Sequence, residues 1–183
     1  MKFLGALLKF LAAAIIGVVI AVVVVLFVVM PRMQWNATAR PSAAEHWVAS
    51  YVLRQWVRRN APSESNPIAP TANNLQEGEH EYDEHCAVCH GLDGNAKNHV
   101  GGDFYPPIAR LSKGAAFLSD GQFYFIVSHG IRMTAMPGFG TGHSADELWK
   151  IILWVRHFPN LTPQEHAAIQ ARMKQEEGGE AEH

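Results

Sequence analysis

The chain has few cysteines, no internal repeat and no convincing β-strand. Cys86 and Cys89 are its two cysteines among 183 residues. The lack of a repeat excludes solenoid architectures. The lack of alternating apolar and polar residues excludes a sheet protein and predicts an all-α fold. At this length we expect one domain with appendages.

Charged residues are absent from one long segment, residues 10–30, which consists mainly of Val, Ile, Leu and Ala. As a helix these 21 residues would span about 31 Å, close to the roughly 30 Å thickness of the bilayer core. Lys2 and Lys9 precede the run, and Arg32 and Trp35 follow it, as interface residues do. We therefore predict a transmembrane anchor at 10–30, although the charges on its two sides do not orient it.

A cleaved signal peptide is the alternative interpretation of the same segment. Ala37 and Ala39 offer an A-x-A cleavage site. The apolar core of a signal peptide is typically about 7–15 residues, however, and this run is longer. The length favours an uncleaved anchor.

Charge is also unevenly distributed along the chain. Residues 1–70 contain 7 basic and 2 acidic residues, a formal charge of +5, whereas residues 71–183 contain 8 and 15, a formal charge of −7. The acidic half argues against a nucleic-acid partner and allows electrostatic steering toward a basic one. A solvated helix face before residue 86 and a disordered acidic tail from Glu176 to His183 explain the two acidic runs equally well.

The two cysteines stand in the run Cys86-Ala87-Val88-Cys89-His90, which is the attachment signature of haem c. In such a site the two thiols form thioethers with the porphyrin vinyl groups, and the adjacent histidine is an axial iron ligand. A thioredoxin-like redox pair would need a βαβ context, and a zinc site would need further ligands at metal spacing. Neither surrounds this motif. We predict one covalently bound haem c, held by Cys86 and Cys89 and ligated by His90.

A second iron ligand is predicted in the segment 130–140, which contains Met133 and Met136. Pro137 biases Met136 toward an extended backbone, which suits a rigidly presented thioether ligand. Met133 lacks this support, and we expect it to pack on the ring or in the core. If Met136 is not the ligand, His99 and His129 are the histidines to test, and an open site also remains.

The remaining segments divide into a juxtamembrane part at 31–71, a haem domain at 72–160 and a C-terminal helix with an acidic tail at 161–183. A helix is predicted at 43–60, begun by a capping box of Ser42 and Glu45. Its aromatic and basic residues fit lipid headgroups, a partner subunit, or packing on the haem domain. A Pro-rich, semi-rigid linker follows at 61–71. The haem domain should contain helices at 74–86, 121–129 and from Ser144 to about Phe158, with an irregular stretch at 91–113. A last polar helix should begin at Thr162-Pro163.

A Cys-x-x-Cys-His motif followed 46 residues later by Met-Pro resembles a class I c-type cytochrome. More closely, the chain is similar to the membrane-anchored monohaem cytochromes c of bacteria, over about residues 75–160 and into the anchor. The resemblance implies that Gly78 and Tyr82 lie where the first helix of the domain crosses the helix of residues 149–155. It also implies a cytoplasmic N-terminus at 1–9 and a haem domain in the periplasm, tethered to the inner membrane by a single pass.

The resemblance further implies contacts to the haem. The carbonyl of Pro106 or Pro107 should accept the Nδ1–H of His90, unless these prolines only shape the loop. The candidates for contacts with the haem propionates are Tyr105, Arg110, Arg132 and Trp149.

An iron held by histidine and methionine has no vacant position, so the expected function is single-electron transfer rather than enzymatic catalysis. The redox partners would be proteins at the membrane. A fixed place as the haem subunit of a membrane oxidoreductase complex is the alternative. A haem sensor or peroxidase with a labile sixth ligand is the third hypothesis.

Overall fold

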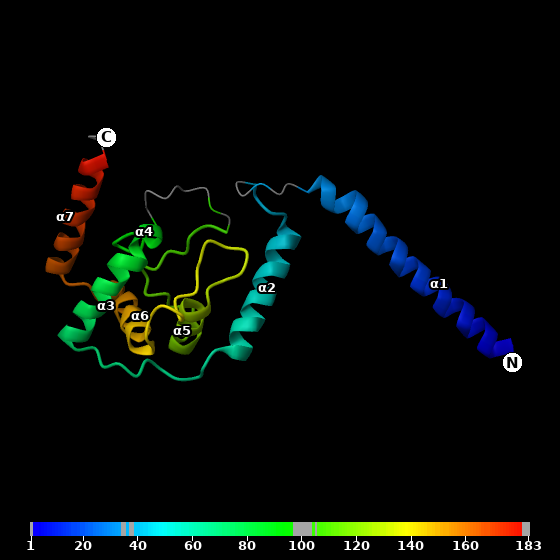
Figure 1. Cartoon of the computed structure of the whole chain (residues 1–183), viewed down its shortest axis with the longest axis horizontal. Coiled ribbons are helices and arrows are strands. Elements are labelled where there is room, and N and C mark those ends of the chain that lie inside the picture. Colours follow the sequence, from blue (N-terminus) through cyan, green and yellow to red (C-terminus); the bar gives the residue numbers. More distant parts are fainter. Residues whose placement is uncertain (1, 34–35, 37–38, 97–103, 105, 181–183) are drawn as a thin grey trace. The chain divides into compact units, whose positions relative to one another are not determined.

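The chain consists of helices joined by irregular segments in the computed structural model, which describes residues 2–33, 36, 39–96, 104 and 106–180. Within these ranges there is no β-strand (Figure 1). The all-α prediction is confirmed. The chain divides into two compact units, Met1–Ala39 and Arg40–His183.

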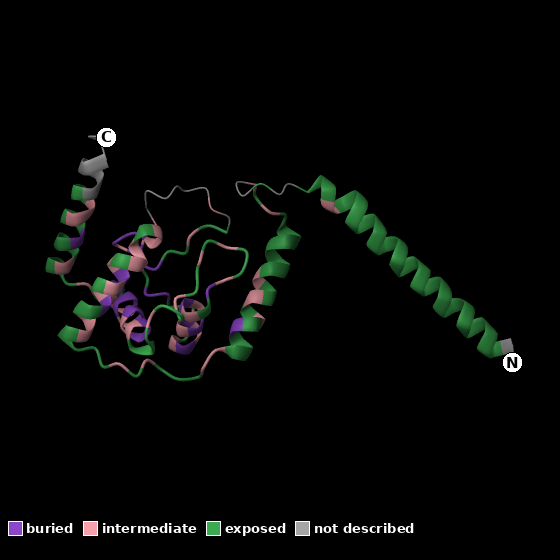
Figure 2. Cartoon of the chain, in the orientation of Figure 1, coloured by how far each residue is buried: buried purple, intermediate pink, exposed green. Residues whose placement is uncertain are grey.

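The first unit is a continuous run of apolar helix. It comprises α1 (Lys2–Val24), the short π-helical turn η1 (Val25–Val29) and the 3-10 turn η2 (Met30–Arg32). Phe3–Arg32 has a mean hydropathy of 3.4 over its most apolar window, and none of that window is buried (Figure 2). The run contains the predicted segment 10–30 and is long and apolar enough to cross a membrane, which makes it a candidate anchor.

The second unit begins with α2 (Ala43–Asn60), which has the predicted bounds. Ser42 caps it by accepting a hydrogen bond from the Glu45 N–H at 3.2 Å. The last turns of α2 pack on α5 (Asp120–His129), where Val57 is buried and the Trp56 ring lies 4.6 Å from that of Phe125. The C-terminal half of α2 therefore packs on the domain that follows it.

The segment between α2 and α3, residues 61–71, is hydrogen-bonded to the helices of the domain. The Asn66 backbone N–H donates to Asp120 Oδ2 at 3.0 Å, and the Asn66 side-chain amide donates to Trp149 O at 2.8 Å. A Cβ on Gly121 would overlap the carbonyl of Pro62. Residues 61–71 are thus packed against the domain and do not form a free linker.

The core lies where α3 (Ala72–His85) crosses α6 (Ala145–His157). Gly78 permits the crossing, because a Cβ there would overlap the backbone of Lys150. Tyr82 is fully buried, with its ring edge-on to that of Phe158 at a centroid distance of 5.3 Å. The predicted contact of Gly78 with the helix of residues 149–155 is confirmed, and Tyr82 packs against Phe158 just after that helix. Figure 2 shows the buried residues gathered on α3, α5 and α6.

Capping residues set the ends of the helices around this core. Ser119 and Gln122 form a capping box at the start of α5, and Gly130 ends that helix with φ +68°. Ser144 and Glu147 form a capping box at the start of α6, the helix predicted from Ser144. The 3-10 turn η3 (Phe158–Asn160) follows α6.

The C-terminal helix, α7 (Pro163–Glu180), is longer and better attached than expected. Ile169 is buried in the core, and Arg172 pairs with Glu79 at 2.8 Å and with Asp83, both on α3. The predicted disorder from residue 176 is wrong for residues 176–180, which continue the helix. Once a helix is held by packing, adding further residues to it costs little. Residues 181–183 lie outside the described part.

Candidate functional site

The Cys-x-x-Cys-His motif forms a helical turn directly after α3. Cys86 is the C-cap of α3 and also the N-cap of α4 (Ala87–His90). Its carbonyl accepts from the N–H groups of Cys89 at 3.1 Å and His90 at 2.8 Å. The buried hydroxyl of Tyr82 donates to Gly91 O at 2.8 Å and so fixes the end of the turn to the core. The turn holds both thiols and the imidazole on one short rigid element.

The imidazole of His90 is oriented by the backbone. Its Nδ1 lies 2.8 Å from Ala109 O. Since a carbonyl only accepts, Nδ1 carries the proton and Nε2 keeps its lone pair. Burial lowers the pKa of His90 below its usual value, although the bond to Ala109 opposes this. The ring is therefore neutral at neutral pH, the form that binds a metal.

The carbonyl beside His90 belongs to Ala109, which corrects the expectation of Pro106 or Pro107. Both prolines are exposed. The reason lies just beyond Ala109: the N–H groups of Leu111 and Ser112 both donate to Gly94 O, at 2.6 and 2.9 Å. These two hydrogen bonds fix the end of the segment. They place Ala109, two residues past Pro107, beside the imidazole of His90.

The thiol of Cys86 is held in its neutral form. Burial, and next the neighbouring Cys89, raise the pKa of Cys86 to about 12. Reactive redox cysteines have lowered pKa values, because the thiolate is the nucleophile. The environment of Cys86 therefore argues against a thioredoxin-like pair and fits a sulfur that forms an uncharged thioether.

The segment with Met136 is a loop closed by backbone hydrogen bonds. Its base is joined to the end of α5 by Phe139 N to Val127 O and Gly140 N to Ser128 O, each 2.9 Å. Within the loop, Ile131 N donates to Met136 O at 3.1 Å. Met136 itself is half-buried against the core.

Thr134 adds a second tie inside the same loop. Its hydroxyl donates to Ile131 O at 2.7 Å and accepts from Met136 N at 3.1 Å. Both backbone polar groups of Met136 are thus bonded within the loop. These bonds fix the backbone from which the thioether projects.

The other candidate residues differ in their surroundings. Met133 has φ +60° and its side chain is 92% exposed, so the expectation that it packs in the protein core is wrong. The Nδ1 of His129 lies 3.0 Å from Phe125 O, within its own helix. Arg110 and Arg132 are exposed, whereas Trp149 is buried with its ring stacked on Tyr124 at 4.3 Å. Tyr105 and His99 lie outside the described residues.

The donor set of this region fits haem c. Cys86 and Cys89 provide two thiols on one helical turn. His90 is a neutral imidazole whose Nε2 is left free by the bond at Nδ1. Met136 provides a soft thioether on a loop that is closed by hydrogen bonds. Two thiols for attachment, with a histidine and a methionine as axial ligands, are the groups that haem c requires.

One cluster of potential ligands was missed by the sequence interpretation. Glu81, His85 and His143 each offer a ligand atom, and these atoms lie within 4.8 Å of one another. The spacing of four residues between Glu81 and His85 could have signalled a shared helix face. His143 lies 58 residues further on, so only the fold brings it to the pair.

Comparison with known proteins supports the same interpretation. Residues 73–155 match a family model described as cytochrome C oxidase, cbb3-type, subunit III. No curated protein matches the chain.

Two solved structures are similar to parts of the chain. One is the reducing HAO-like protein complex of Kuenenia stuttgartiensis, at 25% identity and a TM-score of 0.44, covering 53% of this chain and 50% of that one. The chain therefore spans about half the length of that relative. The other is cytochrome cL of Methylophaga aminisulfidivorans, at 19% identity and a TM-score of 0.36, covering 73% of this chain and 83% of that one.

The attachment motif, the Gly78 crossing of α3 and α6, and the family model all fall on the same residues. Over residues 73–155 the chain is therefore similar to the cytochrome family that this model describes.

Proposed function

We propose that this protein is a membrane-anchored periplasmic cytochrome that passes single electrons between redox partners. One haem c would be held covalently by Cys86 and Cys89 and ligated by His90 and Met136. When bound, the haem supplies a one-electron Fe(III)/Fe(II) couple. The observation that carries the proposal is the neutral, oriented imidazole of His90, whose Nδ1 is bonded to Ala109 O at 2.8 Å.

The role of each protein group follows from its bonding. The carbonyl of Ala109 fixes the tautomer and the ring plane of His90 and raises the basicity of its Nε2. The bonds of Thr134 to the Met136 loop hold the thioether in place. A site closed on both sides excludes substrates, and it changes little in geometry on oxidation. These properties suit a carrier better than a catalyst.

The apolar run Phe3–Arg32 supports a tethered carrier. With the N-terminus in the cytoplasm, a single pass through the inner membrane would place the cytochrome domain in the periplasm. A tether keeps the domain near a membrane-bound donor and raises its effective concentration there.

A fixed position in a membrane oxidoreductase is the second candidate. The first half of α2 exposes Trp47, Val48, Tyr51 and Val52, although its second half is docked. An exposed apolar helix face is what a subunit interface would cover. The matching family model is that of an oxidase subunit. Purification in mild detergent separates the two candidates, since a carrier emerges alone and a subunit emerges with stoichiometric partners.

The ligation is tested by the weak sulfur-to-iron absorption band at the red edge of the ferric spectrum. We expect the full chain to show this band, Met136→Ala to lose it, and Met133→Ala to keep it. Met133 is a matched control, because it lies in the same loop with an exposed side chain.

A ferric spectrum without this band in the wild-type protein would contradict the proposal. Rapid binding of carbon monoxide by the reduced wild-type protein would then favour the sensor or peroxidase hypothesis. Retention of the band in Met136→Ala would assign the ligand to another residue.

A further inference from the structure

A cluster of two histidines and one carboxylate lies at the C-terminal end of α3, outside the proposed haem ligands. Glu81 and His85 are four residues apart on α3, and His143 comes from the loop before α6. The rings of His85 and His143 meet edge to face, with centroids 4.5 Å apart. From this geometry we propose that Glu81, His85 and His143 bind one divalent first-row transition metal, with Zn²⁺ as the representative ion.

The distances distinguish a metal site from an ordinary hydrogen-bonded cluster. Glu81 Oε2 lies 3.6 Å from His85 Nε2 and 3.9 Å from His143 Nε2. Hydrogen bonds between such atoms are about 2.7–3.2 Å long. Two ligand atoms of a tetrahedral zinc site, with bonds of about 2.0–2.1 Å, stand about 3.3 Å apart. The Glu81 oxygen is therefore too distant from either nitrogen for a good hydrogen bond, and both distances are only slightly longer than the spacing around a shared ion.

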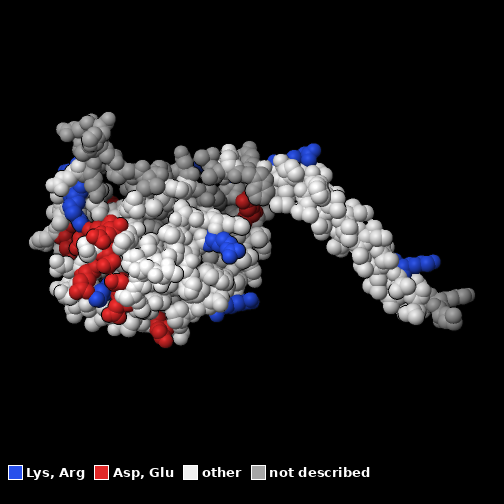
Figure 3. Space-filling view, in the orientation of Figure 1, with Lys and Arg blue, Asp and Glu red and all other residues white. Residues whose placement is uncertain are grey.

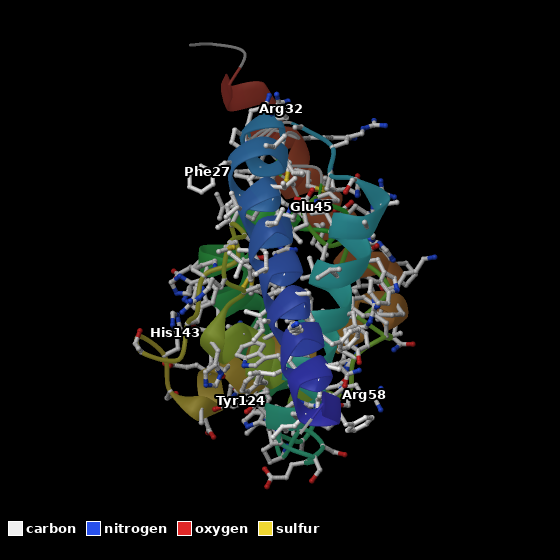
Figure 4. All side chains as sticks on the ribbon, turned by 90° about the vertical axis from the view of Figure 1, so that its right-hand side faces the viewer. Phe27, Arg32, Glu45, Arg58, Tyr124 and His143 are labelled. Carbon is white, nitrogen blue, oxygen red and sulfur yellow. The ribbon has the colours of Figure 1, made fainter. Side chains whose placement is uncertain are left out.

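The orientation of His143 supports the same assignment. Its Nδ1 lies 3.3 Å from Phe139 O, so the backbone can accept the Nδ1–H while Nε2 faces Glu81 and His85. A metal-binding histidine usually donates its second ring N–H to a carbonyl or carboxylate in this way. Figure 4 labels His143, which lies at the edge of the domain in that view.

The cluster is reachable from solvent but not freely exposed. The side chains of His85, Glu81 and His143 are 35%, 21% and 15% exposed. Glu84 Oε2 lies 3.9 Å from His85 Nε2 and adds negative charge beside the site. Asp and Glu residues gather over α3 in Figure 3, which favours a cation.

The chemical class of the ion follows from the ligand set. Two imidazoles and one carboxylate form a borderline set that suits Zn²⁺, Cu²⁺ or Ni²⁺ better than the oxygen-preferring Ca²⁺ and Mg²⁺. Three protein ligands leave a fourth position for water.

Binding would join two parts of the domain. Glu81 and His85 stand on the helix that ends at Cys86, and His143 follows the loop that carries Met136. An ion bridging them would tie this loop to α3 and stabilise the folded state by an amount that grows with the logarithm of the ion concentration over the dissociation constant.

The test uses the full haem-containing chain in detergent, purified without a polyhistidine tag. Zn²⁺ is titrated by calorimetry, and bound zinc is counted after dialysis. We expect one saturable high-affinity site per chain and a thermal unfolding temperature that rises with Zn²⁺. Glu81→Gln, His85→Gln and His143→Gln should each weaken this site by roughly 10–100-fold or more, because even an outer partner of a ligand contributes that much.

The matched control is His80→Gln. His80 also stands on α3 with a carboxylate four residues on, Glu84, at 3.4 Å, but it lies outside the three-residue cluster. This variant should bind Zn²⁺ as the wild-type protein does. Unchanged haem absorption and helicity in all four variants would show that folding is intact.

The proposal is overturned if the wild-type chain takes up no saturable equivalent of Zn²⁺. It is also overturned if His80→Gln weakens binding as much as the cluster variants, because that would indicate adventitious binding by surface histidines. The result does not depend on the identity of the axial haem ligands, so this proposal and the proposed function fail separately.

Discussion

A Cβ added to Gly78 of α3 would overlap the carbonyl oxygen of Lys150 in α6, so the two helix backbones are in direct contact. Trp154 Cβ closes the other side of this contact, 3.3 Å from the same position. The crossing places Tyr82 in the core, and Tyr82 in turn bonds Gly91 after the attachment motif. The geometry of the Cys-x-x-Cys-His turn thus depends on a residue with no side chain.

Gly78→Ala should therefore destabilise the domain strongly. Overpacking a core typically costs about 1–3 kcal/mol, and a clash with backbone cannot be relieved by a rotamer change. We expect about 3 kcal/mol or more in chemical denaturation, with a reduced yield of haem-containing protein. Gly142→Ala is the control, since nothing lies within 4 Å of its Cβ position. If Gly78→Ala were as stable as the wild-type protein, α3 and α6 would be able to move apart without loss of stability.

Thr134→Val should loosen the presentation of Met136. The substitution removes the hydroxyl that bonds both Ile131 O and Met136 N, a loss of about 1 kcal/mol for each bond. The sulfur-to-iron band should weaken and fade at a lower temperature than in the wild-type protein. Thr134→Ser keeps the hydroxyl and should restore the band. Equal spectra in Val and Ser variants would show that the hydroxyl does not position the ligand.

Arg156→Lys should destabilise the domain despite preserving the charge. The guanidinium donates to the carbonyls of Gly114, Ala115 and Leu118 at 2.5–2.8 Å and pairs with Asp120 at 2.9 Å. A lysine ammonium cannot reproduce this planar set of donors. Buried carbonyls left without partners should cost about 2–4 kcal/mol in urea denaturation.

The control for Arg156 is Arg54→Lys, on the exposed face of α2. A surface change of this kind should stay within about 0.5 kcal/mol of the wild-type stability. Similar losses in the two variants would contradict the importance of the guanidinium geometry.

The start of α6 should respond to acid in a defined direction. The Ser144 N–H and hydroxyl bond the Glu147 carboxylate at 2.7 and 2.9 Å and lower the pKa of Glu147. Because the folded pKa is below the unfolded one, the stabilisation is complete above the usual carboxyl pKa and is lost as the pH falls through the folded value.

Glu147→Gln should therefore be less stable than the wild-type protein at pH 7, and this difference should shrink below about pH 4. Ser144→Ala, which removes the cap itself, should cost about 1 kcal/mol at neutral pH. Denaturant unfolding across the pH range tests both. A difference between wild type and Glu147→Gln that grows on acidification would reverse the expected sign.

Local signals predicted much of the helical framework. The caps at Ser42, Ser119 and Ser144 lie at the starts of α2, α5 and α6, because a cap acts on the first turn of its own helix. The length of α7 was underestimated, since Ile169 and Arg172 attach it to residues far away in the sequence. The carbonyl beside His90 was misplaced by two or three residues for the same kind of reason, because Gly94 positions the segment around Ala109.

The residue pattern alone predicted the attachment motif at residues 86–90, the apolar run at 10–30 and the small residue at position 78. Each depends on residue types at short spacing, which chain geometry translates directly into local chemistry. The packing of the helices, in contrast, brings Ala109 to His90 and places His143 beside Glu81 and His85. These contacts join residues 19 or more positions apart, and such pairs meet only when the packing of the helices sets where the intervening loops run.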